Sequence, residues 1–205
     1  MASTKAIVNK EDVKRYLNLT DSSKDTFIQD LIDLASGEIE QYCNRTKFAL
    51  QDITGELVDG TGESILYTKY SPIYAIGSSS ATQASTDVQY RATPDGSWTD
   101  LESDTDFFWV EQYGNYIEFH EAIVPSGKRN VKVNYRAGYS PVPEDVQRVC
   151  IEMVAMMWSE SNNGEKVLGK SSTSMNTGGG SISSSYVNMS DRWRVVLAKY
   201  RTINV

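Results

Sequence analysis

The one motif in this sequence with a recognised chemistry is an eight-residue match to the phosphate-binding P-loop. Gly164, Gly169, Lys170 and Ser171 occupy the defining positions of G-x-x-x-x-G-K-S. A working P-loop needs a buried strand before it and a helix after it, because backbone amides and the helix dipole bind the phosphates. Here a helical pattern precedes the match and a serine/glycine tract follows it. We therefore interpret it as a chance match in biased sequence.

Residues for metal or hydrolytic chemistry are scarce. His120 is the only histidine, and Cys43 and Cys150 are not spaced as zinc ligands. Ser140 has no glycine elbow and is followed by proline, which disfavours a hydrolytic triad. Four alternating carboxylates lack the glycine and distal glutamate of a calcium loop and are interpreted as a solvated loop: Asp100, Glu102, Asp104 and Asp106. The sequence thus predicts no enzyme, no cofactor and no metal site.

The charge of the chain is unevenly distributed. The 205 residues carry a net charge of −7. Residues 190–205 hold four basic side chains against Asp191, a local charge of +3 that leaves −10 for the rest. A strongly acidic body argues against binding the phosphates of nucleic acid. The basic end of the chain is therefore expected to meet a protein surface.

The composition is that of a globular protein, 40% hydrophobic and 23% charged. No apolar run approaches the roughly 20 residues that span a bilayer. The first residues, MASTKAIVNKED, lack the apolar core of a signal peptide. We therefore expect synthesis in a cytoplasm, where Cys43 and Cys150 would be buried thiols without a disulfide.

Three segments with helical periodicity are expected to form the body. A short helix is predicted between Asn9 and Asn18, and a long amphipathic helix from the capping segment 20–23 to about Cys43. A third helix, over 143–159, has an apolar arc covering more than half its circumference, so it should be buried on more than one side. A helix-turn-helix DNA reader is the alternative for the first pair, but the acidic charge favours a plain αα-hairpin.

Between these helices the pattern changes to short strands. Turn signals at 59–62, 94–96 and 114–115 separate five to seven strands, the last at Val131–Tyr135. Their short connections predict an antiparallel sandwich or small barrel. An aromatic set in this region favours a core or subunit interface, with a stacking surface for carbohydrate or a protein ligand as the alternative: Trp98, Phe107, Phe108, Trp109 and Tyr113.

The fold class predicted is α+β, with four parts. A helical body comprises 1–47 and 139–160, an antiparallel β insertion 48–138, a flexible serine/glycine linker 161–188 and a tethered helix 189–205. Ser190 is expected to cap the last helix. An amphipathic helix on a tether is typical of a docking element, and folding back onto its own domain is the alternative.

Three segments, taken together, resemble the head-tail connector (adaptor) proteins of tailed bacteriophages. In chain order they are VKRYLNLTDSSKDTFIQDLIDLASGEIEQYCNR, LVDGTGESILYTKYSPI and VKVNYRAGYSPVPEDVQRVCIEMVAMMW. They cover nearly half the chain and follow the family's order of a helix pair, a hairpin and a strand that enters a helix. The large middle β segment and the long linker depart from that pattern.

The resemblance implies a structural virion protein of the neck, assembled in the host cytoplasm. It implies a ring, commonly of twelve copies, docked below the portal and extending the DNA channel. The implied partners are the portal protein, further copies of the chain and a downstream tail or neck protein; DNA passes without specific binding, and no membrane takes part. Because the family's C-terminal segment reaches the portal, the predicted portal-contact residues are Trp193, Arg194, Leu197, Tyr200 and Arg201.

Overall fold

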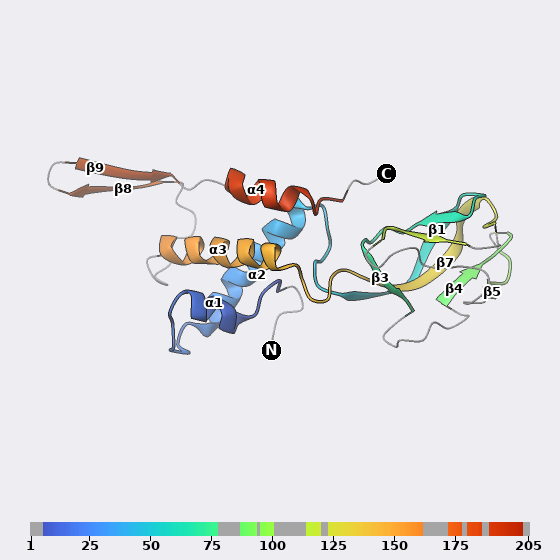
Figure 1. The fold of residues 1–205 in the computed structure, drawn as a ribbon, viewed down its shortest axis with the longest axis horizontal. Coiled ribbons are helices and arrows are strands. Elements are labelled where there is room, and N and C mark those ends of the chain that lie inside the picture. Colours follow the sequence, from blue (N-terminus) through green and yellow to red (C-terminus); the bar gives the residue numbers. More distant parts are fainter. Residues whose placement is uncertain are drawn as a thin grey trace. The chain divides into compact units, whose positions relative to one another are not determined.

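The computed structural model describes residues 6–77, 87–93, 95–100, 114–119, 123–161, 172–177, 180–185 and 189–202. The chain divides into two compact units. The helical unit comprises Met1–Asn44 and Pro143–Arg201, and the β unit comprises Arg45–Val142 and Thr202–Val205 (Figure 1). The class is therefore α+β, as the sequence predicts.

Four helices make up most of the helical unit: α1 (Lys10–Tyr16), α2 (Asp25–Tyr42), α3 (Glu144–Glu160) and α4 (Asp191–Ala198). Helix α3 contacts each of the other three. The wide apolar arc of α3 accounts for these contacts, because a broad arc of buried side chains can pack against more than one neighbouring helix. The residue after the C-cap of α1 and of α2 is an asparagine with left-handed backbone, Asn18 at φ 56° and Asn44 at φ 53°.

Helix α2 packs on α3 through a continuous apolar face. Its buried residues recur at helical spacing: Ile28, Leu31, Ile32, Ala35, Ser36, Ile39 and Glu40. From α3 the buried set is Val146, Val149, Cys150, Met153, Val154 and Trp158. The two faces form most of the core of this unit, and the Ser36 hydroxyl contacts the Cys150 thiol at 3.8 Å within it.

The β unit is built around one long strand, β7 (Gly127–Ala137). Strand β1 (Gln51–Gly60) pairs along one edge of β7, and β3 (Ile73–Ile76) and β4 (Val88–Tyr90) pair with different parts of the other edge. Two further pairings complete the unit: β5 (Thr99–Asp100) with β4, and β2 (Ile65–Tyr67) with β6 (Tyr116–Glu118). All these pairings are antiparallel, as expected.

Alternate residues of β7 point into the core of the β unit. Val131, Val133 and Tyr135 are fully buried and join one cluster with Leu66 of β2 and Ile117 of β6. The core thus takes side chains from the five-stranded sheet and from the β2–β6 ribbon.

Two predicted local features differ from the structure. The turn at 59–62 was expected to join a hairpin, but β1 pairs with β7 and not with β2. The eleven-residue β7 offers β1 a longer ladder, and the Asn130 side chain accepts a hydrogen bond from the Gly60 amide at 2.7 Å. The turn signal at 114–115 also predicts a strand before it, over 107–110; that segment and His120 lie outside the described residues.

The predicted linker also contains regular structure. Strands β8 (Ser172–Thr177) and β9 (Gly180–Ser185) form an antiparallel hairpin within 161–188, the segment predicted to be a flexible linker. Backbone hydrogen bonds alone can pair two strands, so the small polar composition excludes a core but not a hairpin. The P-loop match at 164–171 falls outside the described residues.

Candidate partner-binding surface

Helix α4 is folded onto its own chain. Ser190 caps it, and the Ser190 hydroxyl accepts a hydrogen bond from the Trp193 amide at 3.4 Å, as the sequence predicts. Trp193 and Leu197, one turn apart, are the two buried residues of the helix. The alternative of a helix folded back on its own domain therefore describes this structure, since a strongly amphipathic helix buries its apolar stripe on the nearest core.

Two carboxylates of α3 bind the polar groups of α4; we call Asp145 and Glu152 the α3 acidic pair. Glu152 accepts a hydrogen bond from the Trp193 indole nitrogen at 2.8 Å and lies 3.5 Å from the Arg192 guanidinium. Asp145 accepts a hydrogen bond from the Tyr200 hydroxyl at 2.7 Å and forms an ion pair with Lys199. The acidic pair lies seven residues apart, two turns of α3, and so holds both ends of α4.

The protonation equilibria of these groups reflect the contacts. Burial is the largest influence on Asp145 and raises its pKa, but the bonds from Lys199 and Tyr200 outweigh it and leave the pKa below its usual value. The hydrogen bond to Asp145 raises the pKa of Lys199. Burial, followed by the bond to Asp145, raises the pKa of Tyr200 to about 12. Asp145 and Lys199 are therefore both charged at neutral pH.

Residues at the end of α2 form a second set of contacts with α4. The Tyr42 hydroxyl donates a hydrogen bond to the Arg194 carbonyl at 3.3 Å. The guanidinium of Arg201 lies 5.4 Å from the centre of the Tyr42 ring, and the Cys43 thiol contacts the Leu197 carbonyl at 3.7 Å. These contacts join residues about 150 positions apart along the chain.

The predicted contact residues therefore divide into two groups. Trp193 and Leu197 are buried and Tyr200 is half-buried, so these three position α4 on its own chain. Arg194 and Arg201 are exposed and can reach a partner. Sequence reasoning missed the α3 acidic pair. The signal was present, since two acidic residues two turns apart on one helix complement a basic helix elsewhere in the chain.

Of the aromatic set proposed for ligand stacking, the structure describes only Trp98. Its ring is half-buried, with the guanidinium of Arg91 at 4.7 Å and the ammonium of Lys132 at 5.0 Å from its centre. The ring on which a sugar would stack is thus already engaged by two cations of the same chain. Phe107, Phe108, Trp109 and Tyr113 lie outside the described residues.

No group of three or more potential metal ligands gathers in the part of the chain that the structure describes. Of the four alternating carboxylates, Asp100 is exposed in β5, and the other three lie outside the described residues. Cys43 and Cys150 are both buried and are not joined in a disulfide, as predicted. Burial raises the pKa of the Cys150 thiol to about 12, which disfavours its thiolate.

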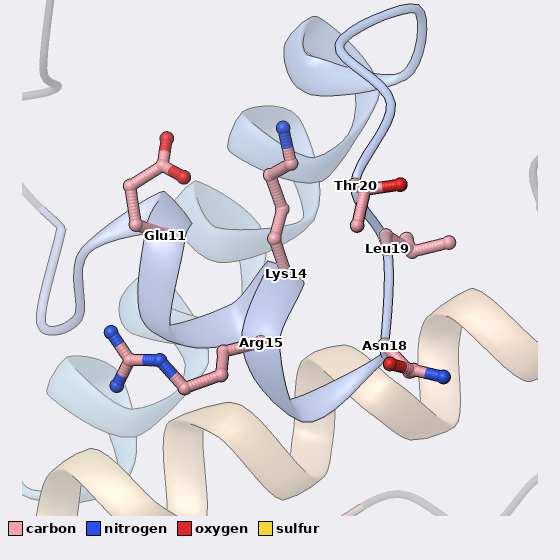
Figure 2. A pocket seen from close by; sticks show the side chains of 6 residues that line it. All are labelled: Glu11, Lys14, Arg15, Asn18, Leu19 and Thr20. Atoms are coloured by element: carbon pink, nitrogen blue, oxygen red, sulfur yellow. The ribbon is translucent and has the colours of Figure 1, made fainter.

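A depression of about 330 Å³ lies beside α1 (Figure 2). Figure 2 shows Glu11, Lys14 and Arg15 on α1 and three residues of the following segment around it. Lys14 donates a hydrogen bond to Asp25 at 2.8 Å, and Arg15 pairs with Asp12 at 3.2 Å. Its cations thus already have carboxylate partners, which disfavours an anion site here. Among the described residues, no helix has the length and apolar character needed to cross a membrane.

Comparisons with known proteins cover almost the whole chain. A family model described as head completion protein matches residues 6–203. Among solved structures, seven chains match. One belongs to the structure "Neck of empty GTA particle computed with C6 symmetry", with a TM-score of 0.54 at 12% identity, over 97% of this chain and 91% of that chain. At this identity the likeness concerns the fold. No curated protein sequence matches.

Proposed function

Because the chain belongs to the head completion protein family, a family of structural virion components, we propose that it forms an adaptor ring between portal and tail. The observation that carries the proposal is the extent of the family match, which spans both units and α4. The ring would extend the channel through which DNA passes. The other members of the assembly would be the portal protein above and a tail or neck protein below.

The charge of the chain supports a passive conduit. A surface that neutralised many phosphates would bind the duplex and hold it in place, because counterions are released on contact. The net charge of −7 opposes such binding. We expect negligible duplex binding at physiological salt, measured by fluorescence anisotropy of a labelled duplex. Micromolar affinity would contradict a passive conduit.

Within this function, we assign portal contact to two exposed cations, Arg194 on α4 and Arg201 in the segment after it. They are the members of the predicted contact set that are exposed. Among the described residues, the ion-pair partner of Arg194 is Asp191, at 3.6 Å within the same exposed helix face. Such a pair is weak, so the guanidinium can exchange it for a carboxylate of a partner at little cost.

The mass of the protein, measured by light scattering alone and with the cognate portal ring, tests the proposal. We expect many copies to join each portal ring. A protein that ignores the portal would refute the adaptor function.

A charge-reversal variant tests the contact residues. Arg194→Glu with Arg201→Glu should weaken portal binding at least tenfold, because two cations would become anions in the contact. Arg15→Glu is the matched control, since Arg15 is also exposed and also pairs with an aspartate three residues before it. Unchanged binding of the double variant would exclude these two cations from the contact.

A further inference from the structure

The helical unit carries an acidic patch on the outer side of α2. Helix α2 contains no lysine or arginine. Its outward residues surround one exposed leucine, and we call them the α2 patch: Asp30, Asp33, Leu34 and Glu38. Leu34 is 50% exposed. A methyl group added at Gly37 would meet nothing within 4 Å, so the surface beside Leu34 is open to an approaching helix.

No cation among the described residues neutralises the carboxylates of the α2 patch. Neither Asp30 nor Glu38 has an ion-pair partner among the described residues, and Asp33 accepts a hydrogen bond only from the uncharged Gln29, at 3.1 Å. Partial desolvation, with no cation nearby, raises the pKa of Glu38. An incoming cation would relieve this cost.

A patch of opposite charge surrounds the most exposed large apolar side chain on α4. Val195 is 76% exposed and has Arg192 three residues before it and Lys199 four residues after it. Arg148 of α3 joins this group, because it and Arg192 both contact Glu152, at 3.9 and 3.5 Å. We call Arg148, Arg192, Val195 and Lys199 the α4 patch.

The outermost charges of the α4 patch are positive. The side chains of Arg148, Arg192 and Lys199 are 57%, 71% and 60% exposed. The carboxylates that they contact, Asp145 and Glu152, are only 25% and 20% exposed and lie beneath them. An approaching surface therefore meets three cations around a valine, together with the exposed carboxylate of Asp191, which lies four residues before Val195 and pairs with Arg194 at 3.6 Å.

We propose that the α2 patch of one copy binds the α4 patch of the next copy. The inference rests on the proposed ring and names the surfaces that join its members. The two patches match in order and spacing. Asp30, Leu34 and Glu38 place acid, apolar and acid groups over about 12 Å of helix, and Arg192, Val195 and Lys199 place base, apolar and base groups over about 10 Å.

A contact between two different patches of identical chains is heterologous, so each copy binds one neighbour on each side. Such contacts form a ring when the rotation between neighbours closes and an open filament when it does not, and the proposed adaptor requires the closed form. The portal contact remains available in such a ring. At about 100° per residue, Arg194 lies about 160° around α4 from Arg192, on the other side of the helix. One helix can thus serve both partners.

Charge substitutions at the two patch centres test the contact. Leu34→Lys places a cation against the α4 patch of the neighbour, and Val195→Glu places an anion against the α2 patch. Each should weaken ring assembly on the portal at least tenfold, measured as copies bound per portal ring by light scattering. The double variant should recover most of the loss, because the two introduced charges, opposite in sign, then face each other on adjacent copies and attract.

Two results would overturn the proposal: single variants that assemble like the unmodified protein, or a double variant no better than the singles. Ile123→Lys and Ile123→Glu are the controls, since Ile123 is 69% exposed in the β unit, and they should assemble normally.

Cross-linking separates this inference from the ring function itself. Copies carrying Leu34→Cys are mixed with copies carrying Val195→Cys and oxidised with glutathione disulfide. A disulfide-linked dimer should form only in the mixture, because the native cysteines are buried. If the protein ignores the portal, the adaptor function fails while the cross-link still tests the contact. Absence of the cross-linked dimer at high protein concentration would refute the contact.

Discussion

Helices α2 and α4 both pack on α3, but by different means. Helix α2 presents an apolar face along eighteen residues, with five fully buried aliphatic side chains among them. Helix α4 has eight residues, two of which are buried, and its other contacts are polar, with the α3 acidic pair and with Tyr42 and Cys43 at the end of α2. Apolar burial scales with area and is insensitive to pH, whereas exposed ion pairs respond to pH and salt. We therefore expect the packing of α2 on α3 to be insensitive to pH and salt, and the attachment of α4 to respond to both.

The largest effect is expected from the α2–α3 core. Ile32→Ala should reduce the free energy of unfolding by about 3 kcal/mol, because Ile32 is fully buried and its loss leaves a cavity. Urea denaturation followed by circular dichroism measures this. Leu34→Ala, on the exposed side of the same helix, is the control and should change stability by less than about 0.5 kcal/mol. Similar losses for both would mean that α2 is not held by its buried face.

The next largest effect should be local to α4. Trp193→Ala removes the larger of two buried side chains and the donor to Glu152, so α4 should detach while α2 and α3 stay packed. Hydrogen exchange of 191–198 should accelerate more than tenfold, with exchange in α2 unchanged. Val195→Ala, at the exposed side, is the control. Faster exchange throughout the helical unit would show that α4 belongs to the same cooperative core as α2.

A smaller effect is expected at the start of α4. Ser190→Ala removes the capping hydroxyl and should cost about 0.5 kcal/mol of helix stability, the lower end of the usual range because the bond is 3.4 Å long. Exchange of the Trp193 amide, which loses the hydroxyl and keeps the Ser190 carbonyl at 3.0 Å as its acceptor, reports the change. Ser190→Asp should preserve the protection, since aspartate is also a strong cap. Loss of protection in both variants would argue against a capping role.

The smallest effect at neutral pH, with a distinctive pH dependence, is expected for Asp145→Asn. Weakening one partly exposed ion pair should raise the detached fraction of α4 by less than about twofold. The folded-state pKa of Asp145 is lowered, so its contribution is present above the ordinary value of 3.8 and is lost as pH falls through the folded value. The pKa of Lys199 is raised, so its contribution is present below the ordinary value of 10.5 and is lost as pH rises through the folded value.

The indole N–H resonance of Trp193 provides the measurement for Asp145→Asn. In the unmodified protein the attached fraction should be constant between about pH 5 and pH 10 and should fall at both ends. In the variant, the loss at the acid end should be smaller, because the introduced amide does not titrate. An acid transition of the same size in both proteins would show that other carboxylates control the attachment.

Much of this fold follows from local patterns in the sequence. The apolar spacing along α2 and α3 decides that these residues are helical and which side is buried, because an amphipathic helix is stable only with that side covered. The alternation of Val131, Val133 and Tyr135 with polar residues likewise predicts a half-buried strand. The capping role of Ser190 depends only on its position before an apolar run.

Contacts between segments that are far apart in the sequence could be identified only in the tertiary structure. Strand β1 precedes a turn suited to a hairpin, yet it pairs with β7 some 70 residues later, because the longer ladder and the Asn130 side chain favour that partner. A hairpin also forms in the serine/glycine tract. It could not be predicted from the hydrophobic pattern, because backbone hydrogen bonds pair the strands and do not depend on apolar side chains.

At the candidate site, the spacing of apolar and basic residues over 189–205 is enough to predict an amphipathic, basic helix. It did not determine which side meets a partner. That depended on Asp145 and Glu152, about 40 to 55 residues away along the chain, which bind Tyr200 and Trp193 and turn the apolar stripe inward. Charge pattern is a local property of a segment, whereas exposure depends on which distant surface covers it, and only the folded chain brings those surfaces together.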